Sequence, residues 1–440
     1  MQSDSPTFSR ETLKVFCHIA SNEKWHIEMS DVQAAFLQAD RIKRNVFIQP
    51  PEERKKPNMV WRLLKPSYGL RDASRQWFIS TVETLKRLGM TQSFNDSCLF
   101  MYRKYEKLEG LLIFHVDDFL SAGSLCFESD VMTKLRQIYT FGNIERNNFI
   151  FTGIEVKQNQ QFHVSLTQKD FVDSMEYQNY DNRDLHFILS DKENKLIRKS
   201  VGQLSWLSTQ TRPDISFEAL SLSTRLSQAC YADAKEANKV IKKAKNCPIS
   251  LIFQHLGKNL KDLHIKVFAD ASLGGIEDQH LTKSIMGYFI ALCNSDSTFN
   301  TIHWKSRVID KVAQDVKTAE TLALETALDD SLFLSNFITE VYMGPEARYT
   351  IPIYVYDDSK SLIESLFSTK KVKRKTMRVV ISRIQQLIAD RTIKDIRHVS
   401  TKDQLADILT KKGVSAERLR QVLEEGKIKF LDKIGPSHDL

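Results

Sequence analysis

The sequence predicts a multidomain protein of mixed α+β and α/β character. Its 440 residues exceed the length of one ordinary domain, so two or three domains are expected. Hydrophobic residues make up 42% of the chain and charged residues 27%, which is typical of globular proteins with substantial cores. Segments with the two-residue period of strands alternate with segments that have the 3.6-residue period of helices.

Helical and strand patterns precede a central apolar hairpin. We expect a helix at 9–20, a strand at 25–31 that ends at Asp31, short strands at 45–49 and 59–64, and an amphipathic helix at 73–89. Residues 110–124 predict a β-hairpin with Asp117 and Asp118 at or near its turn. Adjacent charges between apolar strands are costly to bury without a cation, and Mg²⁺ prefers oxygen ligands. Because turns favour Asp, a solvated surface turn is the alternative.

The pattern changes after residue 257. Before it we expect strands at 149–156 and 161–165 and helices at 168–177 and over 197–245. The polar segment 257–262 is the best candidate for a domain boundary. After it we expect strands at 264–270, 287–292, 301–304, 353–356 and 394–399, and helices at 319–334, 359–367, 377–389 and 404–410.

The distribution of charged residues and cysteines indicates which partners and which kinds of site the chain can have. The formal net charge is +8, and Lys192 to Lys245 holds eleven basic against five acidic residues, a local excess of 11 − 5 = +6. Such a patch suits a polyanionic partner, although a solvated helix face is equally compatible. The six cysteines form no Cys-x-x-Cys pair, which argues against a zinc site or a disulfide framework. We expect no membrane segment, because no apolar run is long enough, and no signal peptide, because the first residues lack its basic-then-apolar order.

Two sets of acidic residues stand at the ends of predicted elements. In the first half, Asp31 closes one strand, and Asp117 and Asp118 lie in the hairpin. Carboxylates on neighbouring strands can hold two metal ions about 4 Å apart for phosphoryl transfer. The second half offers strand-end and helix positions that could gather oxygen ligands at one sheet edge, with His398 nearby: Asp270, Glu320, Asp358 and Asp407. For each of these four acids taken singly, a surface position is the better explanation.

Short motifs then identify a family. They are 31–37 (DVQAAFL), 68–77 (YGLRDASRQW), 95–100 (NDSCLF), 115–118 (HVDD), 151–156 (FTGIEV), 201–206 (VGQLSW), 211–217 (TRPDISF), 268–272 (FADAS), 319–323 (AETLA), 358–362 (DSKSL) and 404–411 (QLADILTK). In this order, they resemble the reverse transcriptase and ribonuclease H region of Ty1/copia-type LTR retrotransposon Pol polyproteins. The resemblance runs from about residue 3 to about residue 423.

The resemblance implies a palm-type polymerase domain with a thumb-like helical segment, followed by a ribonuclease H-like domain. The implied divisions are reverse transcriptase fingers (truncated) and palm at 1–178, a thumb- or connection-like segment at 179–260, the ribonuclease H-like domain at 261–412 and a C-terminal tail at 413–440. The implied activities are RNA-directed DNA polymerase and RNA–DNA hybrid ribonuclease, acting in the cytoplasm within retroelement particles or in the nucleus. The implied partners are RNA template, DNA primer, RNA–DNA hybrid and deoxynucleoside triphosphates.

Site residues follow from the same resemblance, with two Mg²⁺ ions per active site and Mn²⁺ as an alternative. The polymerase acids would be Asp31, Asp117 and Asp118, and the ribonuclease acids Asp270, Glu320, Asp358 and Asp407. Phe36 falls where the family places a bulky residue against a ribose 2′-hydroxyl, with a core Phe as the alternative. Tyr68 and Gly69 would line the nucleotide pocket. The hybrid would be tracked by the basic loop Lys370, Lys371, Lys373, Arg374 and Lys375.

Three departures keep rival interpretations open. The basic fingers segment that usually precedes this region is absent, and His115 replaces the more common Tyr of the VDD motif. Asp357 adjoins Asp358, so the ribonuclease assignment could shift by one residue. The alternatives are a catalytically impaired retroelement remnant that only binds nucleic acid, a chain that retains only ribonuclease H activity, and a two-metal nuclease with the first half as scaffold.

Overall fold

The computed structural model describes residues 4–181, 183–257, 259–278, 281–368 and 374–437. The protein is mixed α/β, as predicted, and none of its described helices is long and apolar enough to cross a membrane. Two compact units form: Met1–Thr152 with Gln158–Phe162 and Glu340–Ala347, and the remainder of the chain. This division does not test the predicted domain boundaries at 178, 260 and 412, which stay predictions.

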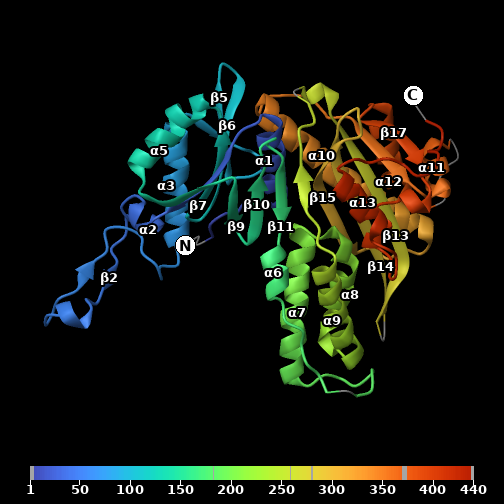
Figure 1. Ribbon diagram of the computed structural model, residues 1–440, viewed down its shortest axis with the longest axis horizontal. Coiled ribbons are helices and arrows are strands. Elements are labelled where there is room, and N and C mark those ends of the chain that lie inside the picture. The colour runs from blue at the N-terminus through green and yellow to red at the C-terminus, as the bar shows by residue number, and fades with distance from the viewer. Residues whose placement is uncertain (1–3, 182, 258, 279–280, 369–373, 438–440) are drawn as a thin grey trace. The chain divides into compact units, whose positions relative to one another are not determined.

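A six-stranded antiparallel sheet organises the first unit (Figure 1). Its strands, in spatial order, are β4 (Met90–Gln92), β5 (Leu99–Lys104), β6 (Lys107–His115), β7 (Asp118–Gly123), β1 (Ile27–Val32) and β8 (Phe141–Arg146). The helices are α1 (Arg10–Asn22), α2 (Ala35–Gln38), α3 (Ala73–Arg87), α4 (Leu125–Phe127) and α5 (Thr133–Ile138), and a small hairpin joins β2 (Phe47–Ile48) to β3 (Trp61–Arg62).

Aromatic residues from strands and helices form one core in this unit. Trp77 of α3 is fully buried with Phe100, Phe114 and Phe119 of the sheet. Burying side chains of this size removes a large apolar area from water, which stabilises the sheet. The predicted helices at 9–20 and 73–89 are confirmed, and Gly89 adopts φ +84 just after α3, a conformation that favours glycine.

The predicted strand at 149–156 is wrong in one respect, because it is two strands. β9 (Asn148–Phe151) and β10 (Ile154–Gln158) are separated by a turn in which Thr152 and Gly153 have positive φ values of 47° and 78°. Strand β8 was not predicted, and the strand predicted at 161–165 is found slightly later, as β11 (Val164–Thr167). A small sheet has the order β12-β11-β10-β9, with β12 at Leu251–Phe253.

The second unit combines a helical segment with a five-stranded mixed sheet. The sheet order is β15 (Phe299–Val308), β14 (Leu281–Cys293), β13 (His264–Asp278), β16 (Ile353–Asp357) and β17 (Ile393–His398). The first three strands are antiparallel neighbours, and β13, β16 and β17 run parallel. The helices are α6 (Lys169–Ser174), α7 (Asp191–Gln210), α8 (Ser216–Arg225), α9 (Tyr231–Asn246), most of α10 (Val316–Met343), α11 (Lys360–Phe367), α12 (Lys375–Ala389) and α13 (Glu417–Glu425).

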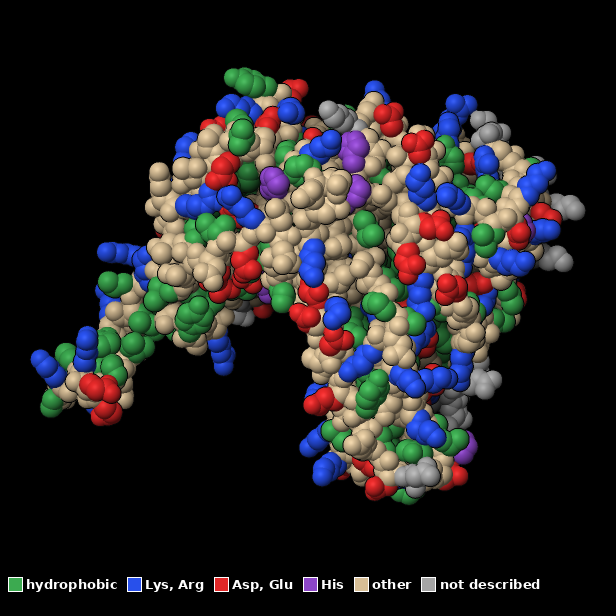
Figure 2. All heavy atoms as spheres, viewed as in Figure 1, with side chains coloured by type: hydrophobic (Ala, Val, Ile, Leu, Met, Phe, Trp, Pro, Cys, Tyr) green, Lys and Arg blue, Asp and Glu red, His purple; other side chains and the backbone are tan. Residues whose placement is uncertain are grey.

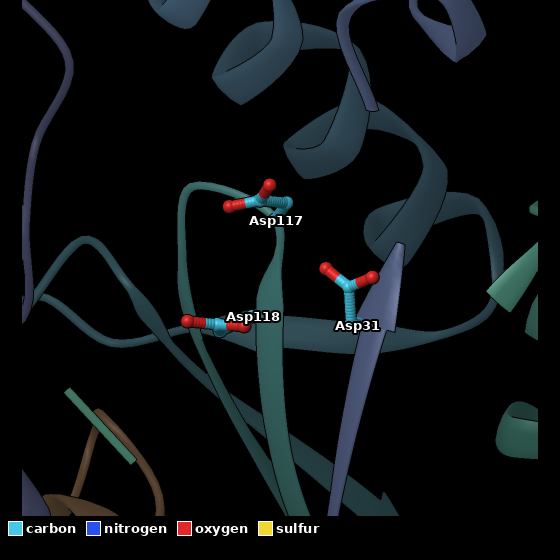
Figure 3. A group of neighbouring side chains, drawn as sticks. All are labelled: Asp31, Asp117 and Asp118. Carbon is cyan, nitrogen blue, oxygen red and sulfur yellow. The ribbon is translucent and has the colours of Figure 1, made fainter. Parts of the chain in front are cut away.

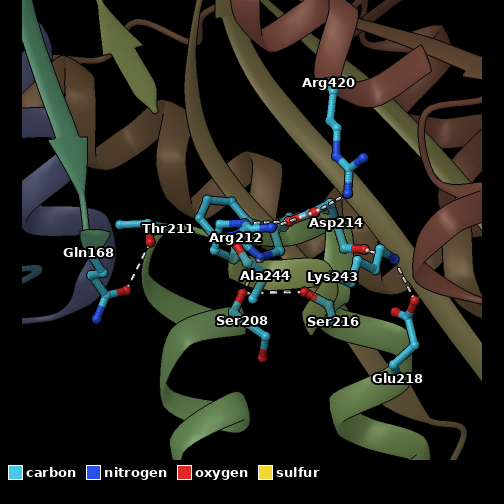
Figure 4. A network of polar contacts seen from close by, with 11 residues as sticks. Gln168, Ser208, Thr211, Arg212, Asp214, Ser216, Glu218, Lys243, Ala244 and Arg420 are labelled. Atoms are coloured by element: carbon cyan, nitrogen blue, oxygen red, sulfur yellow. Dashed lines mark hydrogen bonds and ion pairs between the residues drawn. The ribbon is translucent and has the colours of Figure 1, made fainter. Parts of the chain in front are cut away.

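A buried ion-pair network joins α7, α8, α9 and α13 at the motif 211–217 (Figure 4). The Arg212 guanidinium donates to both oxygens of Asp214, at 2.8 and 2.9 Å, and to the carbonyl of Ala244 at 2.9 Å. Arg420 of α13 donates to the same carboxylate at 3.0 Å, and Lys243 donates to the Asp214 carbonyl. Burial alone would raise the pKa of Asp214, and the hydrogen bonds from the two arginines outweigh it and hold that pKa below its usual value.

The predicted helix at 404–410 is also wrong. The segment contains only a 3₁₀ turn, Asp407–Leu409, and another 3₁₀ turn, Thr401–Asp403, precedes it. The end of the segment packs closely against β14. A Cβ atom on Gly287 would lie 2.6 Å from the Cβ of Leu409. The absence of a side chain on Gly287 therefore allows this turn to lie against the sheet.

Candidate functional site

Three carboxylates meet at one end of the six-stranded sheet (Figure 3). Asp31 lies on β1 directly opposite Asp118 on β7, and Asp117 occupies the two-residue turn between β6 and β7. Their ligand atoms all lie within 4.8 Å of one another. Within the described part of the chain, no other group of three or more Asp, Glu, His or Cys side chains meets this criterion. The predicted hairpin is therefore confirmed, with Asp117 in its turn.

The hairpin turn is held by hydrogen bonds from two other elements. Val116 adopts φ +58, and its carbonyl accepts a hydrogen bond from the indole nitrogen of the buried Trp77 at 2.6 Å. The carbonyl of Asp117 accepts from the amide of Val32 at 2.9 Å. These bonds fix the turn against α3 and β1, so the carboxylates do not depend on a mobile loop for their positions.

The electrostatics of this cluster suit a cation. Burial raises the pKa of Asp31, and the negative charge of Asp117 raises it further. The pKa of Asp118 is also raised, first by burial and then by the charges of Asp117 and Asp31. None of the three carboxylates forms an ion pair with a described residue. Gly142 of β8 leaves space beside the cluster, since a Cβ there would lie 3.2 Å from Oδ2 of Asp31. Half-buried carboxylates that share a site without a cationic side chain fit divalent metal binding.

The predicted nucleotide-pocket residues lie in the same unit. Phe36 on α2 is mostly buried in the core, and its ring centroid is 4.7 Å from that of Tyr68. Tyr68 is 63% exposed and precedes Gly69, which has φ +90. Both interpretations of Phe36 remain compatible with this placement, because a core ring can also present one edge to solvent.

The second acidic set lies around the strand pair β13–β14 and its neighbours. Asp270 is fully buried on β13 opposite Gly287, and Asp407 begins the 3₁₀ turn that packs on the same glycine. Glu320 lies on α10, where burial and then the charges of Asp270 and two further acids raise its pKa. Burial also raises the pKa of Asp270. The structure thus brings these acids within electrostatic reach of one another.

Two buried oxygen atoms in this set have no hydrogen-bond partner among the described residues. They are Oε2 of Glu320 and Oδ2 of Asp357. Burial raises the pKa of Asp357 to about 8. Unpartnered buried carboxylate oxygens cost free energy unless a cation or a proton satisfies them, so this donor set fits a hard metal ion.

Asp357 and Asp358 differ in exposure. Asp357 ends β16 and accepts a hydrogen bond from the amide of Ser359 at 2.8 Å. Asp358 is half-buried, its Oδ2 accepts from Thr401 at 3.1 Å, and its carbonyl lies 3.2 Å from Nε2 of His398. His398 therefore lies beside the acidic set, as the sequence suggested, and either aspartate remains a candidate ligand.

Sequence reasoning missed the cationic member of this site. The ammonium of Lys411 lies 3.1 Å from Oδ1 of Asp270 and 2.6 Å from Oδ1 of Asp407. The neighbouring Thr410 donates a hydrogen bond to the other oxygen of Asp270. The four-residue spacing between Asp407 and Lys411 was a signal for an ion pair, whereas the contact with Asp270 depends on the tertiary fold.

Basic side chains lie on two separate surfaces. Figure 2 shows Lys and Arg side chains over the helical segment of α7 and α9, where the exposed ones are Lys192, Lys195, Arg198, Lys199, Lys235, Lys239 and Lys242. In the predicted basic loop, Lys370, Lys371 and Lys373 lie outside the described residues. Arg374 is exposed and forms an ion pair with Asp315 at 2.8 Å, and the exposed Lys375 begins α12.

Comparison with known proteins identifies the first part of the chain. Residues 2–182 match the family described as reverse transcriptase (RNA-dependent DNA polymerase). Retrovirus-related Pol polyproteins from transposon RE1 of Arabidopsis thaliana and transposon TNT 1-94 of Nicotiana tabacum are 24% and 25% identical, each over 92% of this chain. The Ty1-BL Gag-Pol polyprotein of Saccharomyces cerevisiae is 22% identical over 93% of it. The chain spans 28%, 31% and 24% of these three relatives.

Solved structures match with low scores. An LC11-RNase H1 in complex with RNA/DNA hybrid has a TM-score of 0.25 and 19% identity, over 33% of this chain and 92% of that one. A foamy viral protease-reverse transcriptase in complex with dsDNA has a TM-score of 0.23 and 12% identity, over 86% of this chain and 68% of that one. The resemblance predicted from the motifs is confirmed by the sequence matches.

Proposed function

We propose that this chain, which belongs to the Ty1/copia-type reverse transcriptases of retrotransposon Pol polyproteins, is an RNA-directed DNA polymerase with a fused RNA–DNA hybrid ribonuclease. One observation carries the polymerase assignment: Asp31, Asp117 and Asp118 converge on neighbouring strands within the segment that matches the family. On this proposal the six-stranded sheet is the palm, and the helices α7 to α9 act as a thumb-like segment.

Asp31, Asp117 and Asp118 would hold two Mg²⁺ ions, with Mn²⁺ as an alternative. When bound, such ions lower the pKa of the attacking primer 3′-hydroxyl and neutralise charge on the triphosphate and leaving pyrophosphate. The protein supplies a fixed frame, because Trp77 and Val32 hold the turn that carries Asp117. The half-buried position of the carboxylates limits competing water.

Phe36, Tyr68 and Gly69 would shape the nucleotide pocket. The edge of a bulky ring beside a sugar leaves no room for a 2′-hydroxyl, which is how Phe36 would select deoxynucleoside triphosphates. The ring is held by the core and by Tyr68, so it cannot easily turn aside. The Gly69 backbone, where a Cβ would meet no atom within 4 Å, allows close approach of a ligand.

The part of the second unit that holds the five-stranded sheet, within residues 261–412, would be the ribonuclease H-like domain. Asp270, Glu320, Asp407 and either Asp357 or Asp358 would hold two divalent ions that let water cut the RNA strand of an RNA–DNA hybrid. The unpartnered oxygens of Glu320 and Asp357 support cation binding there. The duplex would be recognised by its shape and by the charge of its phosphates. The contacts would come from exposed Lys and Arg side chains of α7 and α9 and from the segment that includes Arg374 and Lys375.

Two assays on the purified chain test both assignments. The template would be RNA with a DNA primer, and we propose that these substrates are met in cytoplasmic retroelement particles or in the nucleus. Asp117→Asn/Asp118→Asn should abolish primer extension and leave hybrid cleavage intact; unchanged extension would show that the polymerase assignment is wrong. Asp358→Asn should abolish cleavage and leave extension intact, whereas loss only with Asp357→Asn would move the ligand to the buried aspartate. If neither the parent chain nor any of these variants cleaved the hybrid, the ribonuclease assignment would be wrong.

A further inference from the structure

We propose that Lys411 is an internal counter-cation between Asp270 and Asp407 that competes with divalent metal and weakens metal binding to the second acidic site. The proposal rests on the proposed ribonuclease function of that site. Lys411 acts through the carboxylates, so it is a positioning residue that sets metal affinity.

The contacts of Lys411 place its charge where a metal would bind. Its ammonium is 2.6 Å from one oxygen of Asp407 and 3.1 Å from one oxygen of Asp270. The side chains of Asp407 and Asp270 are 7% and 0% exposed, so water cannot screen their charges effectively. The ammonium of Lys411 offsets the free-energy cost of burying these two charged carboxylates without a metal ion.

The position of Lys411 is built into the fold. Gly287 lets Leu409 approach the sheet, and Ser306 donates a hydrogen bond to the Leu409 carbonyl at 2.6 Å. Thr410 then donates to the second oxygen of Asp270, which leaves Oδ1 for Lys411. The turn thus delivers two donors to one buried carboxylate.

The same oxygens cannot serve the ammonium and a divalent ion fully. A metal ion must displace Lys411 or share Asp270 and Asp407 with it, and the repulsion between two cations opposes binding. The lysine side chain is 35% exposed, so a route to solvent exists when a metal enters. By contrast, Asp31, Asp117 and Asp118 form no ion pair with a described residue. We therefore expect the second site to need more metal than the first.

Mn²⁺ titration calorimetry on the full chain tests this inference. An Asp117→Asn/Asp118→Asn background silences the first site, so that the heat reports the second. In this background Lys411→Met, which keeps the length of the side chain and removes its charge, should tighten Mn²⁺ binding about tenfold. Lys411→Arg should remain within about threefold of the parent, because it retains the cation. The exposed neighbour Lys412 is the matched control, and Lys412→Met should leave the affinity unchanged.

Thermal unfolding supplies a second measurement. Without metal, Lys411→Met should unfold at a lower temperature than the parent. Saturating Mn²⁺ should raise the unfolding temperature of Lys411→Met by more than it raises that of the parent. Equal or weaker Mn²⁺ affinity in Lys411→Met would overturn the proposal. If hybrid cleavage by the parent then persists, the ribonuclease function stands without this role for Lys411. If neither Mn²⁺ binding nor cleavage is found in the parent and in Lys411→Met, both proposals are wrong.

Discussion

Replacing Gly287 by alanine should impair hybrid cleavage selectively. The added Cβ would lie 2.6 Å from the Cβ of Leu409 and 2.8 Å from Cγ2 of Thr410. Carbon atoms pack at about 3.5–4.0 Å, so the turn and the strand must separate by about 1 Å. Asp407, at the start of this turn, would move with it, while Asp270 would stay on its strand opposite position 287.

The size of the effect follows from this displacement. A misplacement of about 1 Å in a catalytic constellation can cost about a hundredfold in rate. Overpacking of this kind lowers the free energy of unfolding by about 1–3 kcal/mol, which a chain of this size should tolerate. Cleavage should therefore fall about a hundredfold in a protein that remains folded.

Hybrid cleavage and primer extension should be measured on the same preparation. Extension serves as the internal measure of protein amount, because its carboxylates belong to the other compact unit. Gly202→Ala is the matched control, since its Cβ would meet no atom within 4 Å. Cleavage at the wild-type rate in Gly287→Ala would refute the reasoning that this close approach positions the second site.

Three further predictions address other parts of the chain. Phe36→Ala should raise ribonucleotide incorporation relative to deoxynucleotide incorporation in single-nucleotide extension assays; unchanged selectivity would favour a purely structural ring. Arg212→Met removes the closest partner of the buried Asp214 carboxylate and should lower the free energy of unfolding in urea by about 3–5 kcal/mol. A loss below about 1 kcal/mol would contradict a stabilising role for this buried ion-pair network. Folding raises the pKa of Asp357 from 3.8 to about 8, so between these pH values the folded chain keeps a proton that the unfolded chain has released. Without metal, the free energy of unfolding should therefore fall as the pH rises from about 4 to about 8, by up to about 1.4 kcal/mol per pH unit. Asp357→Asn should flatten that decline in urea unfolding with EDTA at pH 5 and 8; an unaltered slope would contradict it.

The hairpin at 110–124 could be predicted because its information is local. Apolar runs on both sides of a polar pair determine two strands and a turn without reference to distant residues. The approach of Asp31 is different, because it depends on β1 pairing with β7 rather than with another strand. Only the family resemblance placed Asp31 beside the hairpin before the structure did.

Local patterns failed where tertiary contacts decided the backbone. The segment 404–410 has apolar residues at helical spacing, yet it forms only one 3₁₀ turn, and Gly287 allows that turn to lie close to β14. The segment 149–156 alternates like one strand, yet positive φ values at Thr152 and Gly153 divide it. The role of Lys411 was hidden for the same reason, since only the folded turn brings it to Asp270.

The two acidic sites solve the same electrostatic problem in different ways. In the first, the carboxylates stay half-buried, and water can stabilise their charge until a metal binds. In the second, Asp270 and Asp407 are buried, and water is replaced by the ammonium of Lys411. A buried site with its own cation folds without metal but must give up an ion pair to bind one. The metal requirement of each activity should therefore follow from how each unit stabilises its carboxylates before the metal arrives.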